Sequence, residues 1–216
     1  LKYSFIFNNQ NNRNQRHFNY LRVDLESSGN ALYSINEIAG THKSDSGYYR
    51  IFGVRYSQYF RINIDFRYYF YFKNKTNSLV WRLLLGAGVP YGNSDELPYE
   101  KGFYAGGAND MRGWIFKSLG PGDYSGNSPY EKIGDIQIEG NLEYRFPIYS
   151  FFKGALFTDI GNIWTYERST TFPGGQFYFN KFYKQLAVDA GVGFRFDFQI
   201  LIFRIDVAVP LKNPAY

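Results

Sequence analysis

The chain has 216 residues, enough for one large domain or for part of a larger protein. It contains no cysteine, which excludes disulfides, thiolate catalysis and zinc–thiolate sites. The net charge is +5, but lysines and arginines are scattered singly, often close to an acid, so the pattern argues against nucleic-acid binding.

Aromatic residues make up 21% of the chain, a loading typical of strands rather than helices. The longest apolar run, near Leu83, is interrupted by Arg82, so no stretch approaches the roughly 18–20 residues of a membrane helix. A mean hydropathy of −0.39 still permits a membrane β-barrel, because barrel strands carry polar residues on one face.

Alternation of apolar and polar residues dominates the chain. From Phe60 to Phe72 every even position is apolar or aromatic, whereas odd positions include Arg61, Asp65 and Arg67. Clear or weaker versions of this pattern predict eight strands, at Leu1–Asn8, Phe18–Glu26, Phe60–Phe72, Leu79–Val89, Ile136–Phe146, Ala155–Trp164, Leu186–Phe198 and Leu201–Val209.

Two features decide between a barrel and a soluble β-sandwich, whose strands also alternate. The predicted strands are about twice as long as the 5–6 residues typical of soluble sheets. Their polar faces mix arginine with aspartate and glutamate, which suits the enclosed polar interior of a barrel. The sequence therefore predicts an all-β fold, an antiparallel transmembrane β-barrel, with the sandwich as the alternative.

The connections alternate in length. Long ones lie at Ser27–Arg50, Pro90–Gly134 and Thr165–Phe182, and short ones at Lys73–Asn77, Pro147–Ser150 and Gln199. Because outer-membrane barrels have short periplasmic turns and long outer loops, we expect the long connections to be extracellular.

The segment Pro90–Gly134 is a connection of roughly 45 residues, and loops so long are either functional or disordered. Aromatic residues such as Phe103 and Trp114 favour a loop that folds into the lumen with Arg112 at its tip. An eight-stranded barrel is too narrow to hold it. Since the last residues, Leu211–Tyr216, also look like a turn, strands are expected to be missing at both ends.

Three motifs carry a resemblance to a known family. They are Phe103–Gly107 followed by Met111-Arg112-Gly113-Trp114 and Leu119–Gly122, then Asn141–Pro147, and finally Phe157–Trp164. Together they resemble the sixth extracellular loop and the following strands of the BamA/TamA family of outer-membrane assembly factors. The resemblance is strongest to aromatic-rich members from Bacteroidetes-type bacteria.

The resemblance implies a sixteen-stranded barrel of which this chain carries strands eight to fifteen. Residues 1–216 would then be a C-terminal portion of the barrel domain. The periplasmic POTRA domains, the first half of the barrel and the last strand would lie outside it.

The resemblance also implies the site. The loop motif comprises Gly106, Gly107, Met111, Arg112, Gly113 and Trp114, and the family's loop arginine reaches acids that match Glu143 and Asp159 here. Glu143 lies on the ion-bearing side of its predicted strand, whereas the strand of Asp159 alternates poorly. A guanidinium has five donors and can bridge two carboxylates. Met111 and Trp114 stand where many members have valine and phenylalanine.

By this resemblance the protein is an integral outer-membrane protein that assembles and inserts β-barrel proteins. A TamA-like factor and a two-partner secretion pore remain alternatives. Expected partners are unfolded outer-membrane proteins, accessory lipoproteins or periplasmic chaperones, lipid and lipopolysaccharide. No enzymatic activity, cofactor or metal is expected, because neither His17 nor His42 stands near a nucleophile motif.

Overall fold

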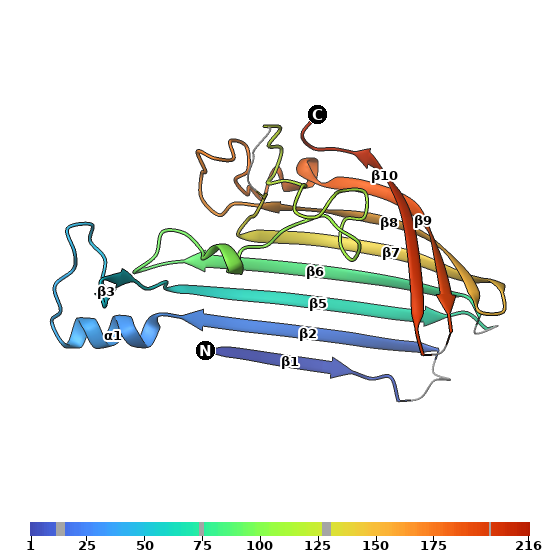
Figure 1. The fold of residues 1–216 in the computed structure, drawn as a ribbon, viewed down its shortest axis with the longest axis horizontal. Coiled ribbons are helices and arrows are strands. Elements are labelled where there is room, and N and C mark those ends of the chain that lie inside the picture. Colours follow the sequence, from blue (N-terminus) through green and yellow to red (C-terminus); the bar gives the residue numbers. More distant parts are fainter. Residues whose placement is uncertain (12–15, 74–75, 127–130, 199) are drawn as a thin grey trace.

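The structure is a computed structural model that describes residues 1–11, 16–73, 76–126, 131–198 and 200–216. Eight long strands form its main sheet (Figure 1). They are β1 (Lys2–Asn8), β2 (His17–Ser28), β5 (Tyr59–Tyr71), β6 (Ser78–Pro90), β7 (Ile136–Tyr149), β8 (Phe152–Trp164), β9 (Ala187–Asp197) and β10 (Ile202–Lys212). Each predicted strand overlaps one of these, so the all-β antiparallel prediction is confirmed.

The strands follow one another in the sheet in chain order, β1-β2-β5-β6-β7-β8-β9-β10, and every neighbouring pair is antiparallel. This up-and-down order is what short or looped connections between antiparallel neighbours produce. The sheet is not closed: β1 and β10 are its edge strands. It curls strongly, so that β9 and β10 cross the direction of β2 and β5 at a steep angle (Figure 1).

One curled sheet accounts for all the long strands among the described residues, so the alternative of two packed sheets is wrong. The face that carries the Pro90–Gly134 segment is called the inner face here. Acids on alternate positions of the strands are buried there: Asp65, Glu139, Glu143, Asp159 and Asp189. The opposite, outer face exposes apolar side chains such as Leu156, Ile160, Ile205 and Val207. This division of polar and apolar faces is that of a membrane barrel wall.

No helix in the described part of the chain is both long enough and apolar enough to span a bilayer.

The Pro90–Gly134 segment folds against the inner face, over β7, β8 and β9 (Figure 1). Its side chains Phe103, Ala105, Met111 and Leu119 are buried with Ile163 and Ala187, and Trp114 packs against this cluster. The disordered reading of the segment is therefore wrong for the part that the structure describes. It has little regular structure beyond the short helix η1 (Tyr99–Lys101).

Two boundaries differ from the prediction. Strand β7 continues to Tyr149, past the predicted turn at Pro147, with a register irregularity between those residues. Strand β10 extends to Lys212, so the prediction that a turn begins at Leu211 is wrong. The proline in this strand, Pro210, lies where the sheet ends and where the β9–β10 register also shifts, which is a position that tolerates proline. The short turn predicted at Gln199 lies outside the described residues.

The long connection after β2 contains elements that the sequence did not predict: α1 (Asn30–Ile38) and the hairpin β3 (Arg50–Ile51) and β4 (Val54–Arg55). The apolar side chains Leu32, Ile35 and Ile38 recur at helical spacing but are exposed, and no α1 side chain is buried. It is held through Tyr33, whose ring packs edge-on against Tyr49, and through Glu37, which accepts a hydrogen bond from the Tyr49 hydroxyl. A last short helix, η2 (Phe182–Gln185), precedes β9.

Candidate functional site

The loop motif forms a compact turn that presents Arg112 to the wall. The amide of Gly107 donates to the Trp114 carbonyl (3.0 Å), and the Trp114 amide donates to the Met111 carbonyl (3.2 Å). Gly106 and Gly107 have φ values of 108° and 116°, which side chains other than glycine rarely adopt. The two glycines therefore allow the chain to reverse before the arginine.

The Arg112 guanidinium is shared between two carboxylates of the wall. Its Nε donates to Asp159 Oδ2 and its Nη2 to Asp159 Oδ1, both at 2.8 Å, while Nη1 donates to Glu143 Oε2 at 2.7 Å. Planar forks of this kind are among the strongest hydrogen-bonded ion pairs in proteins. The side chain of Arg112 is only 7% exposed, that of Glu143 9% and that of Asp159 0%.

Phe157 forms the floor of this site. The Arg112 Cζ lies 3.4 Å from the centroid of its ring, a cation–π contact. Desolvation alone would lower the pKa of Arg112, but the carboxylates of Asp159 and Glu143 outweigh it, and the pKa of Arg112 is raised. The arginine therefore stays charged inside the fold.

A wider ion network surrounds Glu143. Its Oε1 accepts from Arg145 Nε (2.6 Å) and from Arg195 Nη2 (2.7 Å), in addition to the Arg112 contact on Oε2. Asp206 of β10 stands 3.6 Å from Arg112 Nη1. Three cations around one carboxylate compensate the cost of burying it, which an isolated ion could not meet.

Gly113 is held by a carboxylate of β9. Its amide donates to Asp189 Oδ2 at 2.8 Å, and Asp189 lies directly opposite Asp159 in the β8–β9 ladder. A Cβ on Gly113 would lie 2.7 Å from the Asp189 Cβ, closer than real side-chain contacts. Glycine is therefore required here by close approach to the wall.

The structure thus brings all the predicted site residues together. Arg112 meets Glu143 and Asp159, Met111 is fully buried, and Trp114 packs beside it. In β8 the odd positions face inward, which explains the poor alternation of this strand: the buried Phe157 occupies an inward position because the guanidinium lies on its ring.

Sequence reasoning did not select Phe157, Asp189, Arg195 or Asp206 for the site. The three charged residues lie on the polar positions of β9 and β10, so their inward direction was readable. Their contact with the loop depends on the register between strands, which the alternation does not contain.

Among the described residues, no group of three or more His, Cys, Asp or Glu side chains could hold a metal ion. His17, one of the two histidines, lies in an aromatic group: its ring is near that of Phe70, and its Nδ1 is 3.3 Å from the Tyr68 hydroxyl.

Comparison with known proteins gives the family of the chain and a similar fold. The sequence matches a family profile described as the Omp85 superfamily domain over residues 1–216. A similar fold is found in the crystal structure of BamA from Haemophilus ducreyi lacking POTRA domains 1–3, with a TM-score of 0.55 and 15% sequence identity. The match covers 98% of this chain and 51% of that chain, so the chain spans about half the length of the structure it resembles. The chain belongs to the Omp85 superfamily.

Proposed function

We propose that this protein assembles and inserts other β-barrel proteins into the bacterial outer membrane, and that the loop carrying Arg112 stabilises its barrel. Membership of the Omp85 superfamily and the BamA-like fold support the first part. The single observation that carries the second is the desolvated fork from Arg112 to Asp159 and Glu143.

The physical role of the loop follows from where it is attached. Asp159 belongs to β8, Glu143 to β7, and the Gly113 amide is bound by Asp189 of β9. One turn of the loop therefore joins three neighbouring strands on their inner face. A factor that offers a sheet edge to incoming strands must open locally and keep the rest of its wall intact. The loop stabilises the part of the wall formed by β7, β8 and β9, which stays closed.

The proposed partners are unfolded outer-membrane proteins, with lipid and lipopolysaccharide against the outer face and with accessory lipoproteins or periplasmic chaperones. The reaction is non-covalent, so we propose no catalytic residue and no cofactor. The exposed apolar outer face supports integral insertion in the outer membrane.

Reconstitution tests the proposed function. The full-length protein is placed in lipid vesicles with a small unfolded barrel protein, and folding of that client is followed by the shift of the folded form on unheated gels. Vesicles that contain the protein should fold the client faster than empty vesicles. A protein that leaves client folding unchanged, but releases a soluble exported substrate across the membrane, would instead be a secretion pore.

The proposed orientation is tested separately. A peptide tag inserted between Ser125 and Gly126 should be labelled from outside intact cells, because long loops of such barrels face outward. A tag in the connection between β5 and β6 should be labelled only after permeabilisation. The reverse pattern would contradict the orientation.

A further inference from the structure

A second set of contacts holds the loop at Ala108 and Asn109, between the Gly106-Gly107 turn and Arg112. Arg82 of β6 donates from Nη1 to the Asn109 carbonyl at 3.0 Å. Arg204 of β10 donates from Nη2 to the Ala108 carbonyl and, at 2.8 Å, to the Asn109 side-chain Oδ1. Neither arginine makes a hydrogen bond to Asp159 or Glu143 among the described residues, but Arg204 pairs with Asp206 Oδ2, which also lies 3.6 Å from Arg112 Nη1. Asp206 therefore links this attachment to the Arg112 site.

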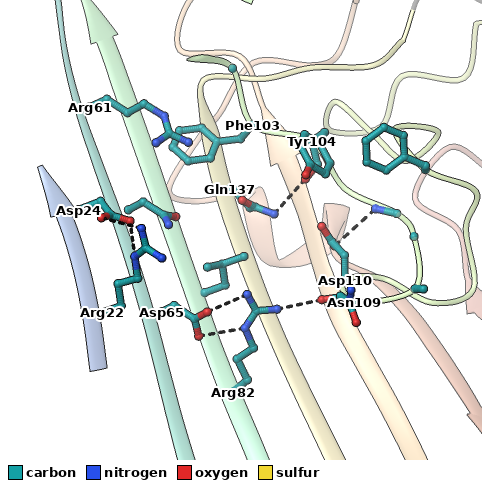
Figure 2. Close-up of a pocket in the computed structure, with 17 residues that line it drawn as sticks. Arg22, Asp24, Arg61, Asp65, Arg82, Phe103, Tyr104, Asn109, Asp110 and Gln137 are labelled. Atoms are coloured by element: carbon teal, nitrogen blue, oxygen red, sulfur yellow. Dashed lines mark hydrogen bonds and ion pairs between the residues drawn. The ribbon is translucent and has the colours of Figure 1, made fainter. Parts of the chain in front are cut away.

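Both arginines pair with a carboxylate of the wall and bind the loop, but the wall contacts differ. Arg82 uses Nε and Nη2 to bind both oxygens of Asp65, each at 3.0 Å, which leaves Nη1 for the loop (Figure 2). Arg204 uses Nε to bind Asp206 Oδ2 at 3.1 Å, which leaves Nη2 for the loop. The Arg204–Asp206 contact is an ion pair without hydrogen-bond geometry, whereas the two bonds to Asp65 fix the guanidinium plane of Arg82. A guanidinium fixed in this way loses little further freedom when it binds a carbonyl.

These contacts of Arg82 and Arg204 with residues 108–109, called the bridge here, span much of the curled sheet. Strands β6 and β10 are separated by β7, β8 and β9 in the strand order, yet both contact the same two loop residues. Residues 108–109 therefore connect two distant parts of the wall through space rather than through the ladder.

The bridge also lies between two polar cavities on the inner face. One, of about 490 Å³, is lined on the far side by Arg22, Arg61 and Asn63 of β2 and β5 (Figure 2 shows its lining residues). The other, of about 430 Å³, is lined by groups that include Glu143 and Arg204. Arg82 and the loop residues 108–110 line both cavities, so they form the partition between them.

We propose that residues Ala108 and Asn109, gripped by Arg82 and Arg204, form a cross-tie that fixes the distance between β6 and β10 and separates the two polar cavities. The tie is made by arginines other than Arg112, and it does not rest on the proposed insertion activity. Two of its three hydrogen bonds go to backbone carbonyls, so only Asn109 contributes a side chain to it from the loop.

Arg67 supplies a matched control. It binds Asp65 with Nε (3.0 Å) and Nη2 (2.7 Å), as Arg82 does, but no hydrogen bond or ion pair joins Arg67 to the loop in the described part of the chain. Arg67→Gln and Arg82→Gln therefore each remove one of the two guanidiniums on Asp65. Only the second removes a bond to the loop.

Hydrogen exchange of the loop amides in the full-length protein, in lipid, measures the tie directly. A hydrogen bond to a charged group stabilises the closed state of the loop, so its loss makes local opening more frequent. Exchange at the amides of residues 107–114 should therefore be about tenfold faster in Arg82→Gln and in Arg204→Gln. This factor corresponds to the lower end of the stabilisation expected for a hydrogen bond to a charged group, because Ala108 and Asn109 are exposed. Arg67→Gln should exchange as the unmodified protein does.

Spin labels give the second readout. Since the chain has no cysteine, Leu83→Cys and Ile205→Cys, each next to a gripping arginine, provide the only labelling sites within these 216 residues. The distance between the labels should be narrowly distributed in the Arg67→Gln background and broad in the Arg82→Gln background. Equal distributions and equal exchange rates in the two backgrounds would overturn the proposal.

Substitutions of Asn109 keep the test decisive if an arginine variant fails to fold, as shown by an unshifted band on an unheated gel. Asn109→Asp keeps the acceptor for Arg204 and adds charge, so exchange should be as slow as in the unmodified protein or slower. Asn109→Ala removes the Oδ1 acceptor and should exchange faster. Identical exchange in these two variants would contradict a tie through this side chain.

Discussion

Removing the guanidinium of Arg112 should destabilise the barrel mainly through Asp159. In Arg112→Ala, the fully buried Asp159 keeps hydrogen bonds from the Asn141 amide (2.9 Å) and from the residue-112 backbone amide (3.2 Å) but loses the guanidinium that neutralises it. Breaking a buried pair and leaving one charge uncompensated typically costs about 3–5 kcal/mol. The remaining polar contacts and the nearby cavity place the expected cost near 3 kcal/mol on that scale.

The two carboxylates should respond differently. Glu143 retains Arg145 and Arg195 after the loss of Arg112, so its charge stays compensated. A double-mutant cycle should therefore give a coupling energy near the upper end of the usual range, about 2–3 kcal/mol, for Arg112→Ala with Asp159→Asn. For Arg112→Ala with Glu143→Gln we expect about 1 kcal/mol.

Denaturant unfolding of the protein in lipid vesicles, followed by tryptophan fluorescence and by the gel shift, measures the four free energies of each cycle. Arg168→Ala serves as the control because this loop arginine is exposed. Additive losses in the Asp159 cycle would show that the arginine does not depend on that carboxylate. A larger coupling energy with Glu143 than with Asp159 would contradict the expectation that Arg112 is the main cation for Asp159.

Three further predictions follow from the same geometry. Gly113→Ala should destabilise by about 1–3 kcal/mol, because its Cβ would overlap the wall carboxylate that binds the residue-113 amide. Gly102→Ala in the same loop, where the new Cβ would have 3.4 Å of clearance, should leave the unfolding midpoint nearly unchanged. Ile64→Arg, on the outer face, should lower the free energy of unfolding by about 2–4 kcal/mol if this position lies near the bilayer midplane. Asn63→Arg, beside the first cavity, should be tolerated. Equal tolerance of the two substitutions would contradict the barrel assignment. Burial, with the charges of acidic neighbours, raises the pKa of Asp135, so its contribution to stability is present below its unfolded pKa and is lost as pH rises through its folded pKa. Asp135→Asn should therefore gain stability relative to the unmodified protein as pH is raised from 4 to 7, measured as the difference in melting temperature, and a constant difference would show that this carboxyl is not perturbed.

The strands and part of the site were predictable because they depend on local alternation. Even and odd positions of β5 and β7 separate cleanly, so the inward direction of Glu143 could be read from the sequence. The inward direction of Asp159 could not be read with the same clarity. Phe157 shares its parity, and its ring fits on the inner face because the Arg112 guanidinium stacks on it and Gly191 of β9 leaves room beside it.

Other parts of the site depend on contacts between distant segments. The bond from Gly113 to Asp189 requires the register that sets Asp189 opposite Asp159, and register is not encoded in the alternation of one strand. Two of the three hydrogen bonds from Arg82 and Arg204 to the loop end on backbone carbonyls, which every residue carries, so no side-chain pattern could reveal them. The helix α1 was missed although Leu32, Ile35 and Ile38 recur at helical spacing, because the alternation that reveals strands does not detect a nine-residue helix inside a long connection.

The central claim, that a guanidinium fork on this loop supports insertion of client barrels, is tested most directly by Arg112→Lys. Lysine keeps the positive charge, but a single ammonium cannot present the planar fork that binds Asp159 twice and Glu143 once. In the vesicle assay the rate of client folding should fall in Arg112→Lys nearly as far as in Arg112→Ala, with Arg168→Ala at the unmodified rate. A client-folding rate in Arg112→Lys or Arg112→Ala equal to that of the unmodified protein would contradict the account.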